Sequence, residues 1–199
     1  MRAFIVAALL AAGSLSGASA WAQAVEVANV KYEPGIDLAG QKLQLNGAGV
    51  RYKFVVKVYT AGLYLTTKAG TPQEVLAAPG PKRMHIHMLR DIDGNELGRL
   101  FTKGMEDNAP REEFVKSING VLKLSEIFAS RKQLNNGDSF YVDYVPGLGS
   151  TVLVNGKPVG ETIKEPEFFT ALLRIWLGDK PADAGLKEAL LGIKKERRR

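Results

Sequence analysis

Residues 42–65 read KLQLNGAGVRYKFVVKVYTAGLYL and carry the clearest strand pattern of the chain. Apolar and polar residues alternate with period two over 42–45 and again over most of 51–59, a pattern typical of strands with one buried face. The glycine-rich residues 46–49 lie between the two segments and indicate a break. We therefore predict two antiparallel strands that pair as a hairpin, with one face turned to water.

Helix and strand signals follow one another along the next part of the chain. A capping box at 71–74, with proline at the first helical position, predicts a short helix through Ala78. Residues 82–89 alternate as a strand. A second capping box at 93–96 opens a helix with apolar residues at helical spacing.

The second half of the chain continues with a helix, strands and a last helix. Residues 110–128 have a helical apolar period with Gly120 as the expected joint, so two helices or one kinked helix fit. A three-stranded meander is expected at 139–145, at 151–154 and after the Asn155-Gly156 turn. Residues 165–177 are apolar around most of a helix, which indicates a buried, central helix, and 187–191 close the fold.

This order of elements favours one α+β domain over residues 25–192, with an antiparallel sheet and its helices gathered on one face. The composition, 45% hydrophobic and 24% charged, is that of a globular protein. The chain has no cysteine, which excludes disulfides, thiolate zinc sites and cysteine nucleophiles. No phosphate-binding loop, paired-histidine protease motif or nucleophile elbow occurs.

Residues 1–24 have the layout of a secretory signal peptide. Arg2 is followed by an apolar run over 3–12, a Gly/Ser stretch and two small-x-small sites that end at Ala20 and Ala24. We expect cleavage after Ala24, with Ala20 as the alternative. The apolar run is half the length of a bilayer span, and no later stretch is long enough to span. The mature chain is therefore expected to be periplasmic.

The net charge of +6 lies mostly outside the predicted domain. The C-terminal tail, residues 193–199, carries five basic side chains and one acidic side chain, and Arg2 belongs to the leader. The body is left with about +1, so we expect no nucleic-acid partner. The tail is either a frayed terminus or a weak contact for an anionic surface.

Three short motifs have a functional and a structural interpretation. Residues 84–88, MHIHM, contain two histidines and two methionines, both of which can bind metals. On a strand the histidines share one face and the methionines the other, so the four side chains cannot converge on one ion. We expect the histidine face to be exposed and the Met/Ile face to join the core. Residues 91–96 resemble the beginning of a calcium loop but fit a helix cap better. Asp143 is either an acid/base carboxylate or an outward polar residue of a strand. We predict no metal and no cofactor.

Residues 45–51, LNGAGVR, and 57–65, KVYTAGLYL, resemble the paired early strands of the chalcone isomerase fold. Three later stretches fit in the same order: the 81–88 strand with its following helix, 123–128, and the 165–178 helix. The chain is similar to bacterial chalcone isomerase-like proteins that carry a signal peptide. The resemblance implies an open-faced β-sandwich, in which a large antiparallel sheet carries helices on one side and a ligand cleft lies between them.

The resemblance also implies where the catalytic positions of the plant isomerases fall. The arginine matches Arg51. The threonine, the first-helix tyrosine, the asparagine and the late hydroxyl fall on Tyr59, Leu97, Gly104 and Phe169. Cyclising a chalcone requires donors for a phenolate and a ketone oxygen, and the last three residues have none to offer. We therefore expect no isomerase activity.

Non-catalytic, fatty-acid-binding members of the same fold hold a carboxylate with an arginine and a tyrosine, and Arg51 and Tyr59 resemble that pair. An apolar cleft with such a polar end suits a hydrophobic small acid such as a fatty acid. The expected lining residues are Leu97, Leu100, Phe101, Phe168, Phe169 and Leu172. Two alternatives stay open. These residues could fill the core of an accessory interaction protein, or Arg51 and Tyr59 could serve an isomerase or lyase with another substrate.

Overall fold

The computed structural model describes residues 24–193, so the predicted leader up to Gln23 and the basic tail from Lys194 lie outside the described residues. The centre of the fold is one antiparallel sheet with the strand order β11-β10-β9-β6-β5-β4-β3. Its strands are β3 (Gly35–Leu38), β4 (Gln41–Lys53), β5 (Val56–Leu65), β6 (Lys82–Met88), β9 (Ser139–Val145), β10 (Gly149–Val154) and β11 (Lys157–Ile163).

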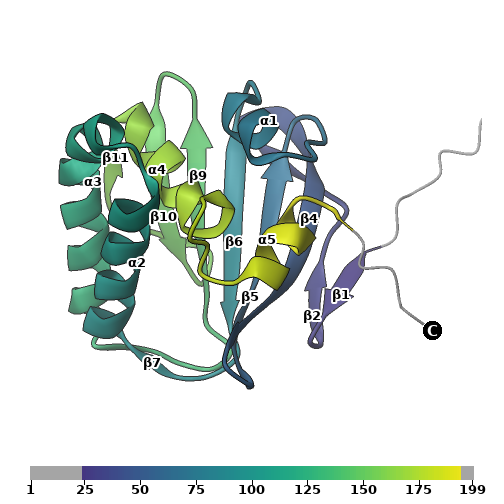
Figure 1. The fold of residues 1–199 in the computed structure, drawn as a ribbon, viewed down its shortest axis with the longest axis horizontal. Coiled ribbons are helices and arrows are strands. Elements are labelled where there is room, and N and C mark those ends of the chain that lie inside the picture. The colour runs from purple at the N-terminus through teal and green to yellow at the C-terminus, as the bar shows by residue number, and fades with distance from the viewer. Residues whose placement is uncertain (1–23, 194–199) are drawn as a thin grey trace, which may run out of the picture.

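The described helices all pack on one face of this sheet, as predicted (Figure 1). They are α1 (Pro72–Ala77), α2 (Gly94–Asn108), α3 (Arg111–Ser130), α4 (Pro166–Leu177) and α5 (Ala184–Leu190). Side chains from every helix join one core cluster with the inward-facing Met84, Ile86 and Met88 of β6. Burial of this continuous apolar layer is the main term that stabilises the fold.

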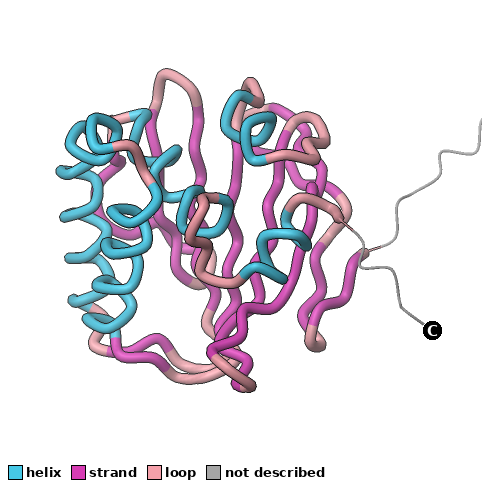
Figure 2. Tube along the Cα trace, in the orientation of Figure 1, coloured by secondary structure: helices cyan, strands magenta, loops and turns pink. Residues whose placement is uncertain are grey.

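The opposite face of the sheet is partly covered by a small hairpin of β1 (Val25–Val27) and β2 (Val30–Tyr32) (Figure 2). Tyr32 packs there in a second cluster with Leu43, Leu45 and Tyr64. A two-stranded ribbon of β7 (Ile92–Asp93) and β8 (Gln133–Leu134) ties the start of α2 to the end of α3. The predicted α+β class is confirmed, with a large curled sheet under one layer of helices.

The predicted break at residues 46–49 is wrong. These residues lie inside β4, which pairs with β5 from Gln44 to Lys53, and the chain turns instead at Phe54-Val55. A Cβ on Gly49 would stand 2.6 Å from the Cβ of Ala189 in α5. Glycine is needed at this position because α5 crosses the strand closely. In the sequence alone, a glycine required by close packing cannot be distinguished from a glycine in a turn.

The expected joint at Gly120 is also wrong, because α3 is a single helix of 20 residues. A Cβ at this position would stand 2.6 Å from side-chain atoms of both Ile163 and Phe168. Gly120 therefore marks a close approach between α3 and its neighbours, and the helix passes through it without a break. The cost of a glycine inside a helix is offset by that packing.

The helix starts predicted at 71–74 and 93–96 are confirmed, although in the described residues the second has only the Asp93 half of its capping box. Thr71 and Glu74 form both halves of the capping box of α1. At α2 the Asp93 carboxylate accepts from the backbone N–H of Glu96 at 2.9 Å, so Asp93 is a helix cap. The Asn155-Gly156 pair turns β10 into β11 with φ of 50° and 77°, which favours these residue types.

Candidate functional site

A cavity of about 200 Å³ lies at one end of the sheet, between β4, β5 and the helices. Its apolar wall comes from Val58, from α2 and from Ile175 of α4. Arg51, Tyr59 and the mouth residues Lys103, Asp107 and Lys180 supply the polar groups. An apolar wall with a few convergent polar groups is the usual composition of a small-molecule site.

Arg51 and Tyr59 form the polar end of the cavity. They are direct partners in the β4–β5 ladder, so their side chains share the helix-covered face of the sheet. The Arg51 guanidinium carbon lies 5.6 Å from the centre of the Tyr59 ring, within cation–π range. Among the described residues Arg51 forms no ion pair, so its fork of N–H donors can bind an anion.

The Tyr59 hydroxyl is held as a neutral donor. Burial raises the pKa of Tyr59 to about 12, although the Arg51 charge and the Trp176 hydrogen bond act in the opposite direction. The indole N–H of Trp176 donates to the Tyr59 oxygen at 2.8 Å. Within the described part of the chain no group accepts the hydroxyl proton, so Tyr59 can donate it to a bound oxygen.

The charges at the mouth are partly neutralised by one another. Lys103 and Asp107 form an exposed ion pair at 2.9 Å, one helical turn apart on α2. Lys180, on the loop between α4 and α5, lies on the same rim. Arg51 is the one arginine that lines this cavity among the described residues, and its planar fork of donors matches a carboxylate better than the rim lysines do.

The structure brings together five of the eight residues expected at the cleft, namely Arg51, Tyr59, Leu97, Leu100 and Phe101. The other three, Phe168, Phe169 and Leu172, lie elsewhere on α4. Phe168 and Leu172 are fully buried in the core, and Phe169 stacks on Tyr144 with ring centres 5.3 Å apart. Leu97 and Gly104, onto which the resemblance placed two catalytic positions of the isomerases, both line the cavity.

Sequence reasoning missed Trp176 and Ile175 as site residues. Trp176 supports Tyr59, and Ile175 lines the cavity. One sequence signal could have identified Trp176. A buried tryptophan generally needs a hydrogen-bond acceptor for its indole N–H, and a tyrosine hydroxyl can be that acceptor.

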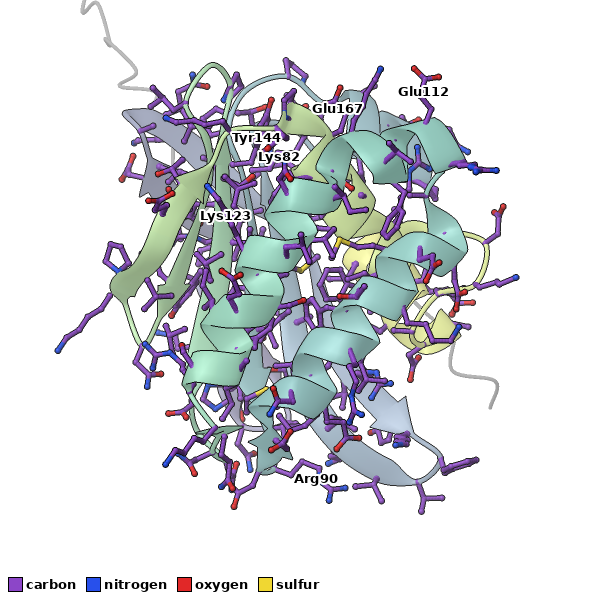
Figure 3. All side chains as sticks on the ribbon, turned by 90° about the vertical axis from the view of Figure 1, so that its left-hand side faces the viewer. Lys82, Arg90, Glu112, Lys123, Tyr144 and Glu167 are labelled. Atoms are coloured by element: carbon purple, nitrogen blue, oxygen red, sulfur yellow. The ribbon has the colours of Figure 1, made fainter. Side chains whose placement is uncertain are left out.

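A larger open groove of about 950 Å³ lies between α3 and β11 and is lined mainly by polar side chains. Its Lys123 and Glu161 pair across the groove at 3.1 Å (Figure 3 labels Lys123). Because its polar groups already bind one another, this groove is a weaker candidate for a hydrophobic ligand than the Arg51 cavity.

The expectation of an exposed histidine face on β6 is wrong for His85. Its ring stacks on Tyr141 at 4.3 Å between centres and lies 5.0 Å from the ring of Tyr32, because the β1–β2 hairpin covers it. Its Nε2 is buried without a hydrogen-bond partner in the described residues. In the same part of the chain, no three His, Asp or Glu side chains lie together as metal ligands.

His85 should make the fold sensitive to acid. Burial, with smaller contributions from His87 and Arg83, lowers its pKa from 6.5 to about 4. The unfolded chain therefore binds the proton more tightly, and stability is lost as pH falls from about 6.5 to 4, by up to about 3 kcal/mol. Urea unfolding across this range checks the loss. His85→Phe, which keeps the ring contacts, should flatten the profile, and an unchanged slope in that variant would refute the assignment to His85.

Asp143 lies on the outward face of its strand, as the structural interpretation expected, but it is buried there. It accepts two hydrogen bonds at 2.5 Å from Arg83 on the neighbouring strand β6. The pair lies on the face of the sheet opposite the cavity, and the Arg83 guanidinium packs over Tyr141. An acid/base carboxylate must reach a substrate, and this one is occupied by its structural partner.

The fold is that of an α+β protein with one large antiparallel sheet and its helices on one face. A small cavity with an arginine at one end lies between the sheet and the helices. A family model described as chalcone isomerase-like matches residues 24–192. The chain therefore belongs to the chalcone isomerase-like family, and the resemblance seen in the sequence is confirmed.

A solved structure, that of a fatty-acid binding protein from Arabidopsis thaliana, is similar to this chain with a TM-score of 0.69 and 14% sequence identity. The match covers 85% of this chain and 96% of the plant protein, so the two share the fold over nearly their whole length. No curated protein sequence matches this chain. None of the helices in the described residues is both long and apolar enough to cross a membrane.

Proposed function

We propose that this protein binds a hydrophobic small acid, such as a short fatty acid, in the Arg51 cavity and performs no chemistry on it. The observation that carries this proposal is that the guanidinium of Arg51, which has no ion-pair partner in the described residues, lies over the ring of Tyr59 at the end of a largely apolar cavity, and that the Tyr59 hydroxyl is neutral. A carboxylate would accept from both groups, and charge-assisted hydrogen bonds of this kind are the strong ones. The fatty-acid binding protein with the same fold supports the ligand class.

The same cavity argues against an isomerase. Leu97 and Gly104 line it and offer no side-chain donor, and Phe169, at the late hydroxyl position, lies outside it. The polar groups present can hold one anionic head, but a chalcone needs both a phenolate and a ketone oxygen to be held. We also propose that residues 1–24 direct export to the periplasm, on the strength of their sequence layout alone.

The size of the cavity limits the ligand. The cavity of about 200 Å³ has room for a short alkyl chain. Typical drug-sized pockets begin at roughly 300 Å³. We therefore propose an acid of about eight carbons, with the tail along Leu97, Phe101 and Ile175.

A calorimetric titration with straight-chain acids from butanoate to hexadecanoate tests this function. Affinity is expected to rise by about threefold to fourfold per methylene as each adds about 0.8 kcal/mol of burial, and to stop rising near eight carbons. The matched alcohol, octanol, should bind at least tenfold more weakly because it lacks the charge. Failure of every acid to bind, or equal binding of octanol and octanoate, would refute the proposal.

A further inference from the structure

The tip of the β4–β5 hairpin is the most exposed apolar segment of the described chain. The hairpin tip comprises Tyr52, Lys53, Phe54, Val55, Val56 and Lys57, all of which are exposed. Phe54 is 93% exposed and Val55 is 90% exposed. Large apolar side chains grouped at this level of exposure generally mark an interaction site.

The backbone of the tip is also unfavourable for its sequence. Lys53 pairs with Val56, so Phe54 and Val55 form a two-residue hairpin loop, and Phe54 has a φ of +57°. Turn positions with positive φ favour glycine or asparagine, and a bulky residue there is strained. Neither packing nor turn formation explains this phenylalanine.

Three basic side chains lie at or next to the apolar tip, and one carboxylate also reaches it, since Asp183 accepts from the backbone N–H of Tyr52 at 2.9 Å. Lys53 and Lys57 belong to the tip, and Arg90 lies two residues after Met88, the β6 residue that pairs with Tyr59. Arg90 lies at the end of the molecule opposite Lys82 and Glu112 (Figure 3). Within residues 24–193 Lys57 and Arg90 form no ion pair, and Lys53 has only a long contact of 3.9 Å with Glu96.

We infer that the hairpin tip docks the protein on an anionic lipid surface. Membrane-surface elements combine a few apolar side chains, which enter the boundary between headgroups and acyl chains, with basic residues that meet anionic headgroups. A protein partner fits less well, because specific interfaces bury about 800 Å² per partner and this tip projects only four apolar side chains. Docking in this way would also place the polar end of the cavity near the lipid, since its residues Arg51, Val58 and Tyr59 lie at the base of the tip.

Vesicle co-sedimentation of residues 25–199 tests the docking without any added fatty acid, so its outcome is independent of the proposed ligand. The predicted leader is left out because its apolar run would itself bind lipid. Wild type is expected to bind vesicles of phosphatidylglycerol and phosphatidylethanolamine at least tenfold better than phosphatidylcholine vesicles. Phe54→Ser/Val55→Ser should lower the partition coefficient at least tenfold. Binding that is unchanged in the double variant, or that is lost on removal of residues 194–199 instead, would overturn the inference.

Matched variants separate docking from folding. Phe54→Asn should lose vesicle binding while its melting temperature stays equal or rises, because asparagine tolerates the positive φ. Leu148→Ser, at a 61% exposed apolar residue in the β9–β10 turn, should bind as wild type. Phe54→Trp should give blue-shifted emission on the anionic vesicles, whereas Leu148→Trp should not. Absence of the shift for Phe54→Trp would contradict insertion of the tip.

Discussion

Arg51→Gln is expected to weaken octanoate binding by about 10- to 100-fold. The substitution removes the charge-assisted hydrogen bonds to the carboxylate, which are worth about 1.5–3 kcal/mol. Isothermal titration calorimetry at neutral pH measures the loss. Thermal stability should stay close to that of wild type, because Arg51 is only partly buried and has no ion-pair partner in the described residues.

Two further variants show whether the loss arises at the carboxylate. Arg51→Lys keeps the positive charge but not the planar fork, and should recover only part of the affinity. Tyr59→Phe removes the second donor and leaves the Trp176 N–H without its acceptor, so it should weaken binding and lower stability together. If Arg51→Gln bound octanoate as tightly as wild type, the acid would not be held at this end of the cavity.

Arg83→Ala is expected to destabilise the fold by about 3 kcal/mol, because it leaves the carboxylate of Asp143 buried without its partner. The Asp143 side chain is only 8% exposed, and Arg83 supplies both of its side-chain hydrogen bonds. A change of this size lowers the melting temperature of a domain this large by roughly 6–12 °C. Thermal unfolding followed by circular dichroism measures it.

The double variant Arg83→Leu/Asp143→Leu is the control for this pair. Replacing both members of a buried ion pair by apolar residues is often nearly neutral, so most of the lost stability should return. Octanoate affinity should not change in any of these variants at 25 °C, since the pair lies on the face of the sheet opposite the cavity. Equal destabilisation in the single and double variants would show that shape, and not the unpaired charge, sets the cost.

The sheet and the order of its elements could be predicted from sequence because their signals are local. Alternation over β6 and β9, the caps at Thr71 and Asp93, and the Asn155-Gly156 turn each depend on a few neighbouring residues. The position of the β4–β5 turn could not be predicted. Glycines that a distant helix requires, at residues 47 and 49, were the stronger turn signal, whereas the true turn carries Phe54 and Val55.

The site could be predicted where a strand fixes the face of each side chain. Arg51 and Tyr59 pair across neighbouring strands, so their convergence depends only on register. Helix α4 is different, because it is apolar around most of its circumference and its sequence does not say which apolar side meets the cavity. The structure turns Ile175 to the cavity and Phe168 and Leu172 into the core.

The burial of His85 and Asp143 could not be predicted either, because it depends on contacts from other segments of the chain. Alternation correctly placed both on the face of the sheet away from the helices, but it could not show that the β1–β2 hairpin covers His85 or that Arg83 encloses Asp143. Those contacts join segments far apart in the chain. A polar residue on the outer face of a strand was therefore mistaken for an exposed one.

A crystal structure of the protein with octanoate would show directly whether Arg51 and Tyr59 hold an acid. We expect the carboxylate to lie within hydrogen-bond distance of the Arg51 guanidinium and the Tyr59 hydroxyl, with the alkyl chain between Leu97, Phe101 and Ile175. Octanoate bound in the polar groove between α3 and β11, or an empty Arg51 cavity at saturating octanoate, would contradict the account.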